Sequence, residues 1–229
     1  MSPRHMLDQQ WQVFKGLDLQ GKTILDVGAG AGYASCYAIA LGAQSVIALE
    51  PEAGGSQLGM VRQAHVLRDE MGYADRIQII PTTFEASGIR SQFDIVLLNA
   101  SINHVNEDAC ALLPDDRRAR AIYLAFFEKL AQVCKPGGLL VITDCSNSNV
   151  FPALGLPNPV MKTIDWRIHQ PPEVWASLLS RAGFIHPRID WTPLTSMGWV
   201  GRVLGSKKFI NYFINSAFRL VMESPRSRG

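Results

Sequence analysis

The stretch that decides the fold is KTILDVGAGAG, at residues 22–32. Its first six residues form a compact apolar run, which predicts a strand. The three glycines that follow, Gly28, Gly30 and Gly32, predict a turn whose backbone approaches a ligand closely. The alanine-rich segment 33–41 predicts a helix whose N-terminus presents free N–H groups. Strand, glycine turn and helix in this order are typical of a site for a nucleotide-type ligand.

The rest of the chain continues this alternation. Apolar runs predict further strands at 45–50, 76–81, 93–98, 139–144, 185–191 and 216–223. Helical spacing and terminal Pro or Gly residues predict helices at 57–71, at 115–134 and between Pro171 and Gly183. An opening helix is predicted because Leu7, Trp11 and Phe14 fall at i, i+4 and i+7. The alternation implies an α/β fold with a parallel sheet, whose ligands bind at the carboxyl ends of the strands.

Length and composition predict a single domain over residues 1–229. The chain is 47% apolar, and its formal net charge of +2 argues against an electrostatic footprint for nucleic acid. No run approaches the ~20 apolar residues that cross a bilayer, so we expect no integral membrane span. The N-terminus lacks the continuous apolar stretch of a signal peptide. The four cysteines match no metal or redox spacing, which favours a reducing, cytoplasmic setting without a metal site.

Two acidic residues indicate which ligand the glycine turn holds. A dinucleotide fingerprint requires a third glycine where this chain has Tyr33. Asp26, two residues before Gly28, would repel a diphosphate and favours a ligand that is cationic at that point. Glu50 ends the second strand and can accept hydrogen bonds from both hydroxyls of a ribose. S-adenosylmethionine carries an ammonium and a sulfonium but no phosphate, so we expect it as the cofactor. The structural alternative is a tight turn beside a surface acid.

With these residues the chain resembles the class I S-adenosylmethionine-dependent methyltransferases, in their small-molecule branch. The resemblance runs from about Gly21 to Asp144 and more loosely to the C-terminus. Four segments carry it, in order and at normal spacing: ILDVGAGAG at 24–32, VIALE at 46–50, FDIVLLNASINHV at 93–105 and KPGGLLVITD at 135–144. It implies a Rossmann-like, doubly wound sheet of seven strands with the last antiparallel, in which 185–191 and 216–223 form the final pair.

The resemblance also implies a set of cofactor-binding residues. Many relatives carry an Asp after the third strand that bonds the adenine amine, and here that stretch is TTFE at 82–85. Thr83 is expected to replace the acid and Phe84 to pack on the adenine ring. The full set expected to bind the cofactor is Asp26, Gly28, Gly30, Gly32, Glu50, Thr83, Phe84 and Asn99.

His104 is the candidate catalytic residue. Methyl transfer is an in-line displacement, to which positioning contributes ~7–11 kcal/mol. A general base is expected for a hydroxyl acceptor and is optional for a neutral amine. His104 follows the fourth strand, and an imidazole suits proton transfer at neutral pH. The alternative is that His104 only braces the next helix. Glu107 and Asp108 are expected to cap or solvate that helix.

Four residues are expected to contact the acceptor: Asn103, Asn147, Trp166 and His169. Each has a structural alternative, namely capping a turn for the two asparagines and anchoring a loop for Trp166 and His169. Three segments are candidate covers of the site: the opening helix within 1–20, residues 146–170, and a lid at 192–215 before the last strand. The lid mixes aromatic and basic residues, which leaves peripheral membrane contact and an oligomer contact open.

We therefore expect an S-adenosylmethionine-dependent methyltransferase that acts on a hydroxyl, less readily an amine, of a small molecule such as a sugar, a glycolipid or a natural product. The Asn-Pro-Pro-Tyr-type motif of enzymes that methylate nucleobase amines is absent after the fourth strand, where the chain has NASI at 99–102. A non-catalytic binding module of the same fold is the alternative. A nicotinamide-dependent oxidoreductase is a remote one, opposed by Asp26 and Tyr33.

Overall fold

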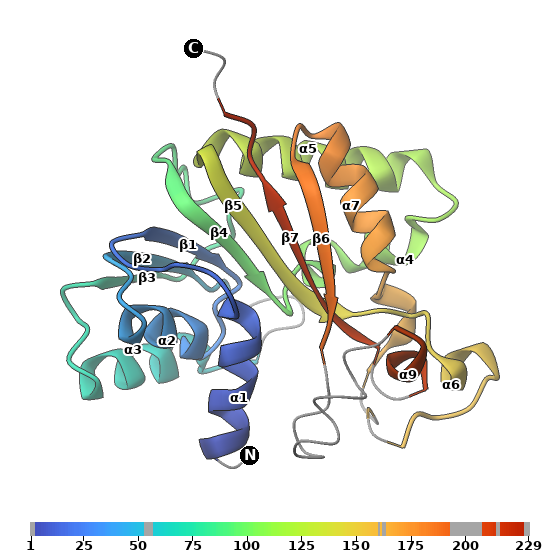
Figure 1. Cartoon of the computed structure of the whole chain (residues 1–229), viewed down its shortest axis with the longest axis horizontal. Coiled ribbons are helices and arrows are strands. Elements are labelled where there is room, and N and C mark those ends of the chain that lie inside the picture. Colours follow the sequence, from blue (N-terminus) through green and yellow to red (C-terminus); the bar gives the residue numbers. More distant parts are fainter. Residues whose placement is uncertain are drawn as a thin grey trace.

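The computed structural model describes residues 3–52, 57–159, 161, 164–192, 208–213 and 216–226, and for residues 3–5 and 210 it describes the backbone alone. Within these residues seven strands form one sheet in the order β3-β2-β1-β4-β5-β7-β6 (Figure 1). The strands are β1 Thr23–Val27, β2 Ser45–Leu49, β3 Ile77–Ile80, β4 Phe93–Asn99, β5 Cys134–Cys145, β6 Ile185–Trp191 and β7 Ala217–Glu223.

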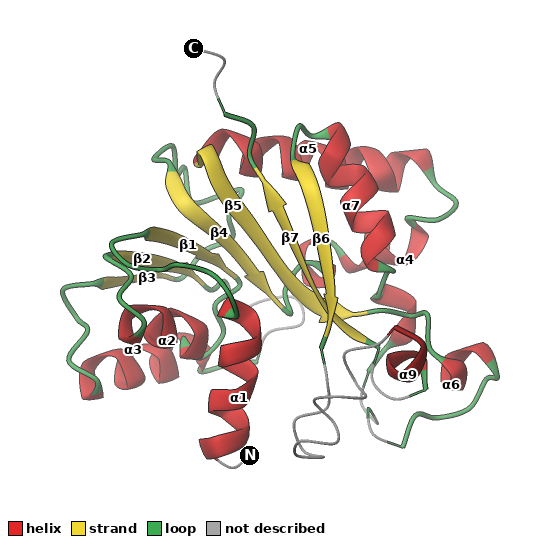
Figure 2. Cartoon of the chain, in the orientation of Figure 1, coloured by secondary structure: helices red, strands yellow, loops and turns green. Residues whose placement is uncertain are grey.

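Helices connect these strands and cover both faces of the sheet (Figure 2). The α-helices are α1 Pro3–Phe14, α2 Tyr33–Ala40, α3 Met60–Glu70, α4 Glu107–Leu112, α5 Arg117–Val133, α6 Val150–Ala153, α7 Pro172–Arg181 and α9 Lys208–Tyr212. Two short 3-10 helices are η1 Asn103–Val105 and η2 Trp166–Ile168.

The sheet confirms the expected doubly wound topology. Neighbouring strands from β3 to β5 pair in parallel, and β7 lies antiparallel between β5 and β6. The chain passes from β1 outward to β3 and then returns to β4 on the other side of β1. The strand order therefore reverses between β1 and β4, which is the place where open α/β sheets bind their ligands.

Alternation along the strands divides the core into two layers. On β4, Ile95 and Leu97 pack in a cluster with residues of α1 and α2, whereas Val96 and Leu98 pack in a cluster with residues of α4, α5 and α7. Successive side chains of a strand point to opposite faces, and both faces of this sheet are buried. The apolar runs that form β1, β4, β5 and β7 are therefore central strands with a helical layer on each side, whereas β6 at the edge of the sheet is largely exposed.

The predicted apolar face of the opening helix is wrong, although the helix forms. Of its three expected core residues, Leu7 is 57% exposed, Trp11 is 46% exposed, and only Phe14 is buried. The buried side of α1 instead carries Gln10, Val13 and Phe14, which also follow helical spacing. The ammonium of Lys15 lies 5.5 Å from the ring centroid of Trp11 on the exposed side.

One element boundary also differs from the prediction. The strand expected at 139–144 begins earlier, because β5 starts at Cys134, immediately after α5. Cys134 pairs with Phe93 at the start of β4. Lys135 Nζ lies 2.8 Å from Asp94 Oδ2, which ties this early part of β5 to β4. Proline and glycines at 136–138 thus lie within the strand rather than in a turn before it.

Most of the lid predicted at 192–215 lies outside the described residues. Of it the structure describes Thr192 and 208–213, which contain α9. Lys208 Nζ lies 2.5 Å from Glu173 Oε1 and 5.6 Å from the ring centroid of Trp191, so α9 is joined to α7 and to the end of β6. No helix in the described part of the chain has the length and hydropathy needed to span a membrane.

Candidate cofactor and acceptor site

A cavity of about 610 Å³ lies at the carboxyl ends of β1, β2 and β4, where the strand order reverses. Its size falls within the range of small-molecule sites. Seven of the residues singled out from the sequence line its wall: Gly28, Gly30, Glu50, Thr83, Phe84, Asn99 and His104. These residues come from four separate stretches of the chain, which the parallel sheet brings to one edge.

Position 28 requires glycine for two reasons, its backbone conformation and the lack of room for a side chain. Its φ is 76°, in the left-handed region that favours glycine. A Cβ built at Gly28 would lie 2.5 Å from the Cβ of Ser101, which follows β4. Ser101 Oγ in turn donates a 2.6 Å hydrogen bond to the carbonyl of Val27. The glycine turn therefore passes directly against the end of β4.

Gly32 lies off the cavity wall, and a Cβ there would lie 3.1 Å from that of Ala64 on α3.

Asp26 lies behind the glycine turn rather than on the cavity wall. Its side chain is fully buried, and Oδ2 accepts a 2.6 Å hydrogen bond from Ser35 Oγ on α2. Burial raises the pKa of Asp26 to about 6, against the lowering effect of the Ser35 hydrogen bond. Oδ1 is buried and has no hydrogen-bond partner within the described residues. Asp26 thus joins β1 to the first turn of α2, and its action on a bound cation stays a prediction.

Glu50 links the end of β2 to the glycine turn. Its carboxylate oxygen Oε2 accepts a 2.7 Å hydrogen bond from the backbone N–H of Gly30, and Oε1 accepts one of 3.0 Å from the backbone N–H of Glu52. The residue is 2% exposed but lies on the cavity wall. A carboxylate has about four acceptor positions, so each oxygen keeps one for a ligand. The two backbone donors hold the carboxylate in place for that purpose.

The segment after β3 forms one end of the cavity. Phe84 is buried, and its ring packs edge-on against that of Phe126 with 5.7 Å between the centroids. Thr83 is exposed, and its Oγ1 accepts a 3.2 Å hydrogen bond from the N–H of Ala86. Its hydroxyl proton remains available to a ligand. Glu85 also lines the wall, and it places a carboxylate at this end that the sequence-based assignment left out.

The end of β4 is held in a strained conformation beside the cavity. Asn99 Oδ1 accepts a 2.5 Å hydrogen bond from Thr143 Oγ1 on β5. Ala100 follows with φ 53°, a left-handed conformation that costs a non-glycine residue on the order of 1–3 kcal/mol. Its N–H donates to the carbonyl of Thr143 at 2.9 Å. The neighbouring strand therefore holds this strained turn, and such strain is typical of functional sites.

His104 lies on the cavity wall in η1, with both ring nitrogens in contact with neighbours. Nδ1 lies 2.7 Å from Glu107 Oε1, and Nε2 lies 3.3 Å from the amide nitrogen of Asn103. A carboxylate accepts, so Nδ1 carries the proton, and an amide N–H donates, so Nε2 carries the lone pair. The ring is one-third exposed. This arrangement fixes the orientation of the His104 ring, with Nδ1 toward Glu107 and Nε2 toward Asn103.

Glu107 is the partner of His104 that the sequence-based assignment missed. Glu107 was expected to cap or solvate the helix, and the capping part of that expectation is wrong. The cap of α4 is Asn106, whose Oδ1 accepts a 2.9 Å hydrogen bond from the N–H of Ala109. Glu107 instead bonds His104. The available signal was the i, i+3 spacing of His104 and Glu107, which brings side chains together on one face of a helical segment.

The four residues expected to contact the acceptor are not on the wall of this cavity. Asn103 is buried beneath His104, and Asn147 is partly buried in the turn after β5. The rings of Trp166 and His169 lie 6.3 Å apart, and His169 Nδ1 is 3.1 Å from Asp144 Oδ1. The geometry thus brings six of the eight expected cofactor residues together with His104 on one wall, while a role in acceptor binding for these four stays a prediction.

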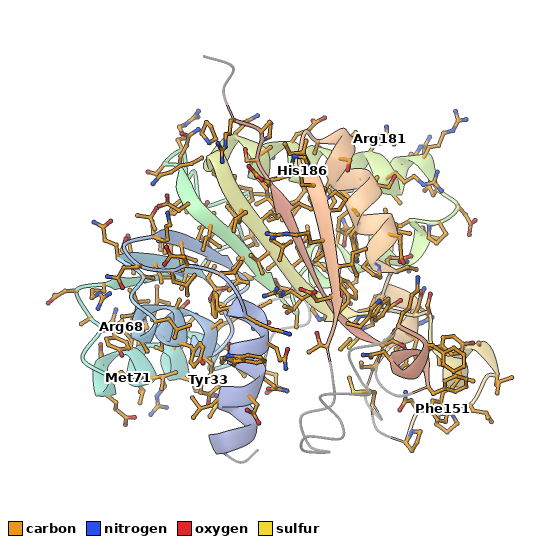
Figure 3. All side chains as sticks on the ribbon, viewed as in Figure 1. Tyr33, Arg68, Met71, Phe151, Arg181 and His186 are labelled. Carbon is orange, nitrogen blue, oxygen red and sulfur yellow. The ribbon has the colours of Figure 1, made fainter. Side chains whose placement is uncertain are left out.

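The other features singled out from the sequence lie elsewhere. His186 is at the end of the sheet opposite α1, as its position beside Arg181 in Figure 3 shows. Tyr33, which replaces the third fingerprint glycine, lies beside α1 and on the cavity wall (Figure 3). Within the described ranges, no three or more His, Cys, Asp or Glu side chains are grouped to hold a metal ion.

Comparisons with known proteins agree with this fold. A family model described as a methyltransferase domain matches residues 5–186. Over 134 residues the chain is 28% identical to protein arginine N-methyltransferase 6 of Xenopus tropicalis, a match that covers 58% of this chain and 34% of that relative. The chain therefore spans about a third of the length of this relative.

Three solved structures illustrate the likeness of fold. An S-adenosylmethionine-dependent methyltransferase from Aquifex aeolicus has a TM-score of 0.65 at 18% identity, over 97% of this chain and 93% of that one. An S-adenosylmethionine-dependent methyltransferase from Mesorhizobium loti has a TM-score of 0.63 at 16% identity, over 94% of this chain and 97% of that one. The [4+2]-cyclase SpnF has a TM-score of 0.62 at 18% identity, over 96% of this chain and 82% of that one. Because the methyltransferase family model matches more than half of the residues of this chain, the chain belongs to the methyltransferase domain family, and S-adenosylmethionine is its cofactor.

Proposed function

We propose that this chain transfers a methyl group to a hydroxyl of a small-molecule acceptor, with His104 as the general base. The observation that carries the proposal is the placement of His104 on the cavity wall with Nδ1 bonded to Glu107. The proton acceptor is then Nε2, which would exchange its 3.3 Å contact with the Asn103 amide for the hydroxyl of the acceptor. A base adds on the order of 10²–10⁴-fold to a transfer in which the acceptor must lose a proton.

The residues of the wall fit the parts of the cofactor. Glu50 has acceptor positions left for the two ribose hydroxyls. Phe84 offers an apolar surface to the adenine ring, and Thr83 and Glu85 offer a donor and an acceptor to its edge. The backbone at Gly28 and Gly30 gives room for close approach next to the helix N-terminus of α2. This fit supports the cofactor assignment of these residues.

The acceptor end requires only positioning and removal of one proton. The cofactor supplies an activated methyl carbon on a sulfonium. With the methyl group supplied by the bound cofactor, whose sulfur would be the leaving group, Nε2 of His104 would take the hydroxyl proton of the acceptor as its oxygen forms the new C–O bond. Glu107 holds the ring in one tautomer and stabilises the imidazolium that forms. The hydrogen bonds between Thr143 and residues 99–100 hold the end of β4 in place at the cavity wall.

An amine acceptor is the second candidate. It is favoured by the 28% identity to a relative named as an arginine N-methyltransferase. A neutral amine does not need a base, so its methylation would depend little on His104. A guanidinium is recognised by carboxylates, and the acceptor positions that Glu50 keeps for a ligand are the ones assigned to the ribose hydroxyls. The other carboxylate among the residues that line the cavity is that of Glu85, in the segment after β3.

The test is a matched pair of histidine variants. His104→Asn is expected to lower kcat about 100-fold or more for a hydroxyl acceptor while leaving the affinity for S-adenosylhomocysteine unchanged. His186→Asn makes the same chemical change at the opposite end of the sheet, so turnover should equal that of the parent. Equal turnover in both variants would leave His104 as a structural brace and would support the amine candidate. Cofactor binding without turnover on any acceptor would support the binding-module alternative.

A further inference from the structure

Gln10 of α1 brings a polar side chain into the cavity from outside the sheet. It lies on the cavity wall, and the residue is 8% exposed. Its amide oxygen Oε1 is buried and has no hydrogen-bond partner within the described residues. A buried acceptor without a partner is destabilising, because it has lost its hydrogen bond to water. A donor on the ligand that fills the cavity would remove this cost.

The position of α1 indicates which part of the ligand meets Gln10. The ring of Phe14 on α1 stacks with that of Tyr37 on α2, with 6.2 Å between their centroids. Tyr33 and Ala34, in the first turn of α2, line the cavity together with Gln10. Gln10 therefore enters the cavity where α2 begins, next to the glycine turn. The residues that fit ribose and adenine come instead from the ends of β2 and β3, nearer one edge of the sheet (Figure 1).

We propose that Gln10 binds the amino-acid end of the cofactor, an inference that rests on the assignment of S-adenosylmethionine. Oε1 accepts a hydrogen bond from the ammonium, and the amide nitrogen Nε2 donates one to the carboxylate. An amide provides both an acceptor and donors, so one side chain can serve both charged groups of an amino acid. The ammonium is a donor only, and Oε1 is a buried acceptor without a donor among the described residues.

Arg219 of β7 is the residue that positions α1. Its Nη1 donates to the carbonyls of Val13 at 3.2 Å and Lys15 at 2.6 Å, at the C-terminal end of the helix. Its Nη2 lies 2.8 Å from Asp190 Oδ2 on β6. The last carbonyls of a helix lack intrahelical partners and attract a cation. A buried guanidinium thus fixes the end of α1 to the sheet, and Gln10 lies about one turn before that anchor.

The experiment compares two ligands that differ only at the amino-acid end. S-adenosylhomocysteine carries that end, whereas methylthioadenosine keeps the adenosine and the sulfur but lacks it. Calorimetric titration of Gln10→Ala should give a Kd for S-adenosylhomocysteine about 10- to 100-fold above that of the parent. The Kd for methylthioadenosine should stay within about twofold of the parent value. Gln9→Ala, at an exposed position of the same helix, is the control and should change neither Kd.

Other outcomes of this titration separate the failure of the inference from that of the cofactor assignment. A parent chain that binds neither ligand overturns both. A parent that binds S-adenosylhomocysteine, with Gln10→Ala binding it equally well, overturns the inference alone. Equal weakening of both ligands also overturns it, because the effect would then not belong to the amino-acid end. Alanine favours a helix more than glutamine does, so the variant is expected to fold, and a thermal melt checks this.

The positioning role of Arg219 has its own readout. Arg219→Lys keeps the charge but loses the planar fork that holds several carbonyls at once. It should weaken binding of S-adenosylhomocysteine and leave that of methylthioadenosine unchanged. Combined with Gln10→Ala, it should add no further loss, because both act through the same contact. Equal weakening of the two ligands by Arg219→Lys would show that the residue only supports the fold.

Discussion

Nδ1 of His104 lies 2.7 Å from Oε1 of Glu107, across the junction between η1 and α4. His104 lines the same cavity as the glycine turn that follows β1. A carboxylate on one ring nitrogen fixes the other as the basic one. This contact orients the imidazole on the cavity wall, and the proposed role of His104 as a base rests on it.

Removing the orienting carboxylate should lower the rate without affecting cofactor binding. Glu107→Gln is expected to reduce kcat for a hydroxyl acceptor by about 10-fold or more, because an amide neither stabilises the imidazolium nor fixes the tautomer as firmly. Asp108→Asn makes the matched change at the next, exposed position and should leave kcat at the parent value. Steady-state kinetics with both variants measure this. A Glu107→Gln enzyme as fast as the parent would remove Glu107 from the mechanism.

A methyl group at Gly28 should be far more harmful than one at Gly30. Gly28→Ala puts a Cβ 2.5 Å from that of Ser101 in a left-handed backbone, so we expect a loss of about 2–5 kcal/mol in the free energy of unfolding. Gly30 has a φ of 54°, but a Cβ added there would meet no described atom within 4 Å, so Gly30→Ala should cost about 1–2 kcal/mol.

Denaturant titrations of the two glycine variants measure the difference, and a compensating change tests its cause. Ser101→Gly removes the atom that the new methyl group meets, so the double variant Gly28→Ala/Ser101→Gly should regain part of the lost stability. Equal losses at Gly28 and Gly30 would contradict the close approach of the turn to β4.

Glu50 should act on the ribose and therefore on both ligands of the calorimetric comparison. Glu50→Ala removes the carboxylate that accepts from Gly30 and that fits the ribose hydroxyls. We expect the Kd values of S-adenosylhomocysteine and methylthioadenosine to rise together, by about 10-fold or more. This pattern differs from that expected for Gln10→Ala. A loss confined to S-adenosylhomocysteine would place the carboxylate at the wrong end of the cofactor.

Asp26 should make the stability of the fold depend on pH. Burial raises the pKa of Asp26 from 3.8 to about 6, so the folded state disfavours its ionisation. The stability that this group contributes is fully present below the unfolded pKa and is lost as pH rises through the folded one. Between about pH 4 and pH 7 the parent should therefore lose about 3 kcal/mol relative to Asp26→Asn. Urea titrations across this range measure the difference, and parallel pH profiles would contradict it.

The strands followed from the sequence because the central part of this sheet is buried on both faces, whereas the seven-stranded topology was implied only by the family resemblance. Continuous apolar runs and the glycine turn at Gly28 mark such strands without any knowledge of their neighbours. The predicted buried face of α1 was wrong because it depends on how the helix packs against its neighbours. Apolar spacing alone suggested Leu7 and Trp11, whereas contact with α2 and the anchor at Arg219 select the side that carries Gln10 and Val13.

The site was predictable where a residue follows a strand and unpredictable where a partner comes from elsewhere. Glu50 and His104 each follow a strand of the parallel sheet, so its edge brings them together. Gln10 carries no motif, and its place on the wall depends on how α1 docks. His169 follows no strand, and its ring contacts Asp144 instead of lining the cavity. Such contacts depend on packing between segments far apart in the chain.

The central claim is that the methyl group goes to oxygen, and nuclear magnetic resonance tests it directly. The chain is incubated with cofactor carrying a carbon-13 methyl group and with a mixed panel of alcohols, sugars, phenols and amines. The chemical shift of the labelled carbon distinguishes a methoxy product from an N-methyl one. A new methoxy signal that forms with the parent and is strongly reduced with His104→Asn is the expected result. An N-methyl signal that forms equally fast with both proteins would contradict the claim.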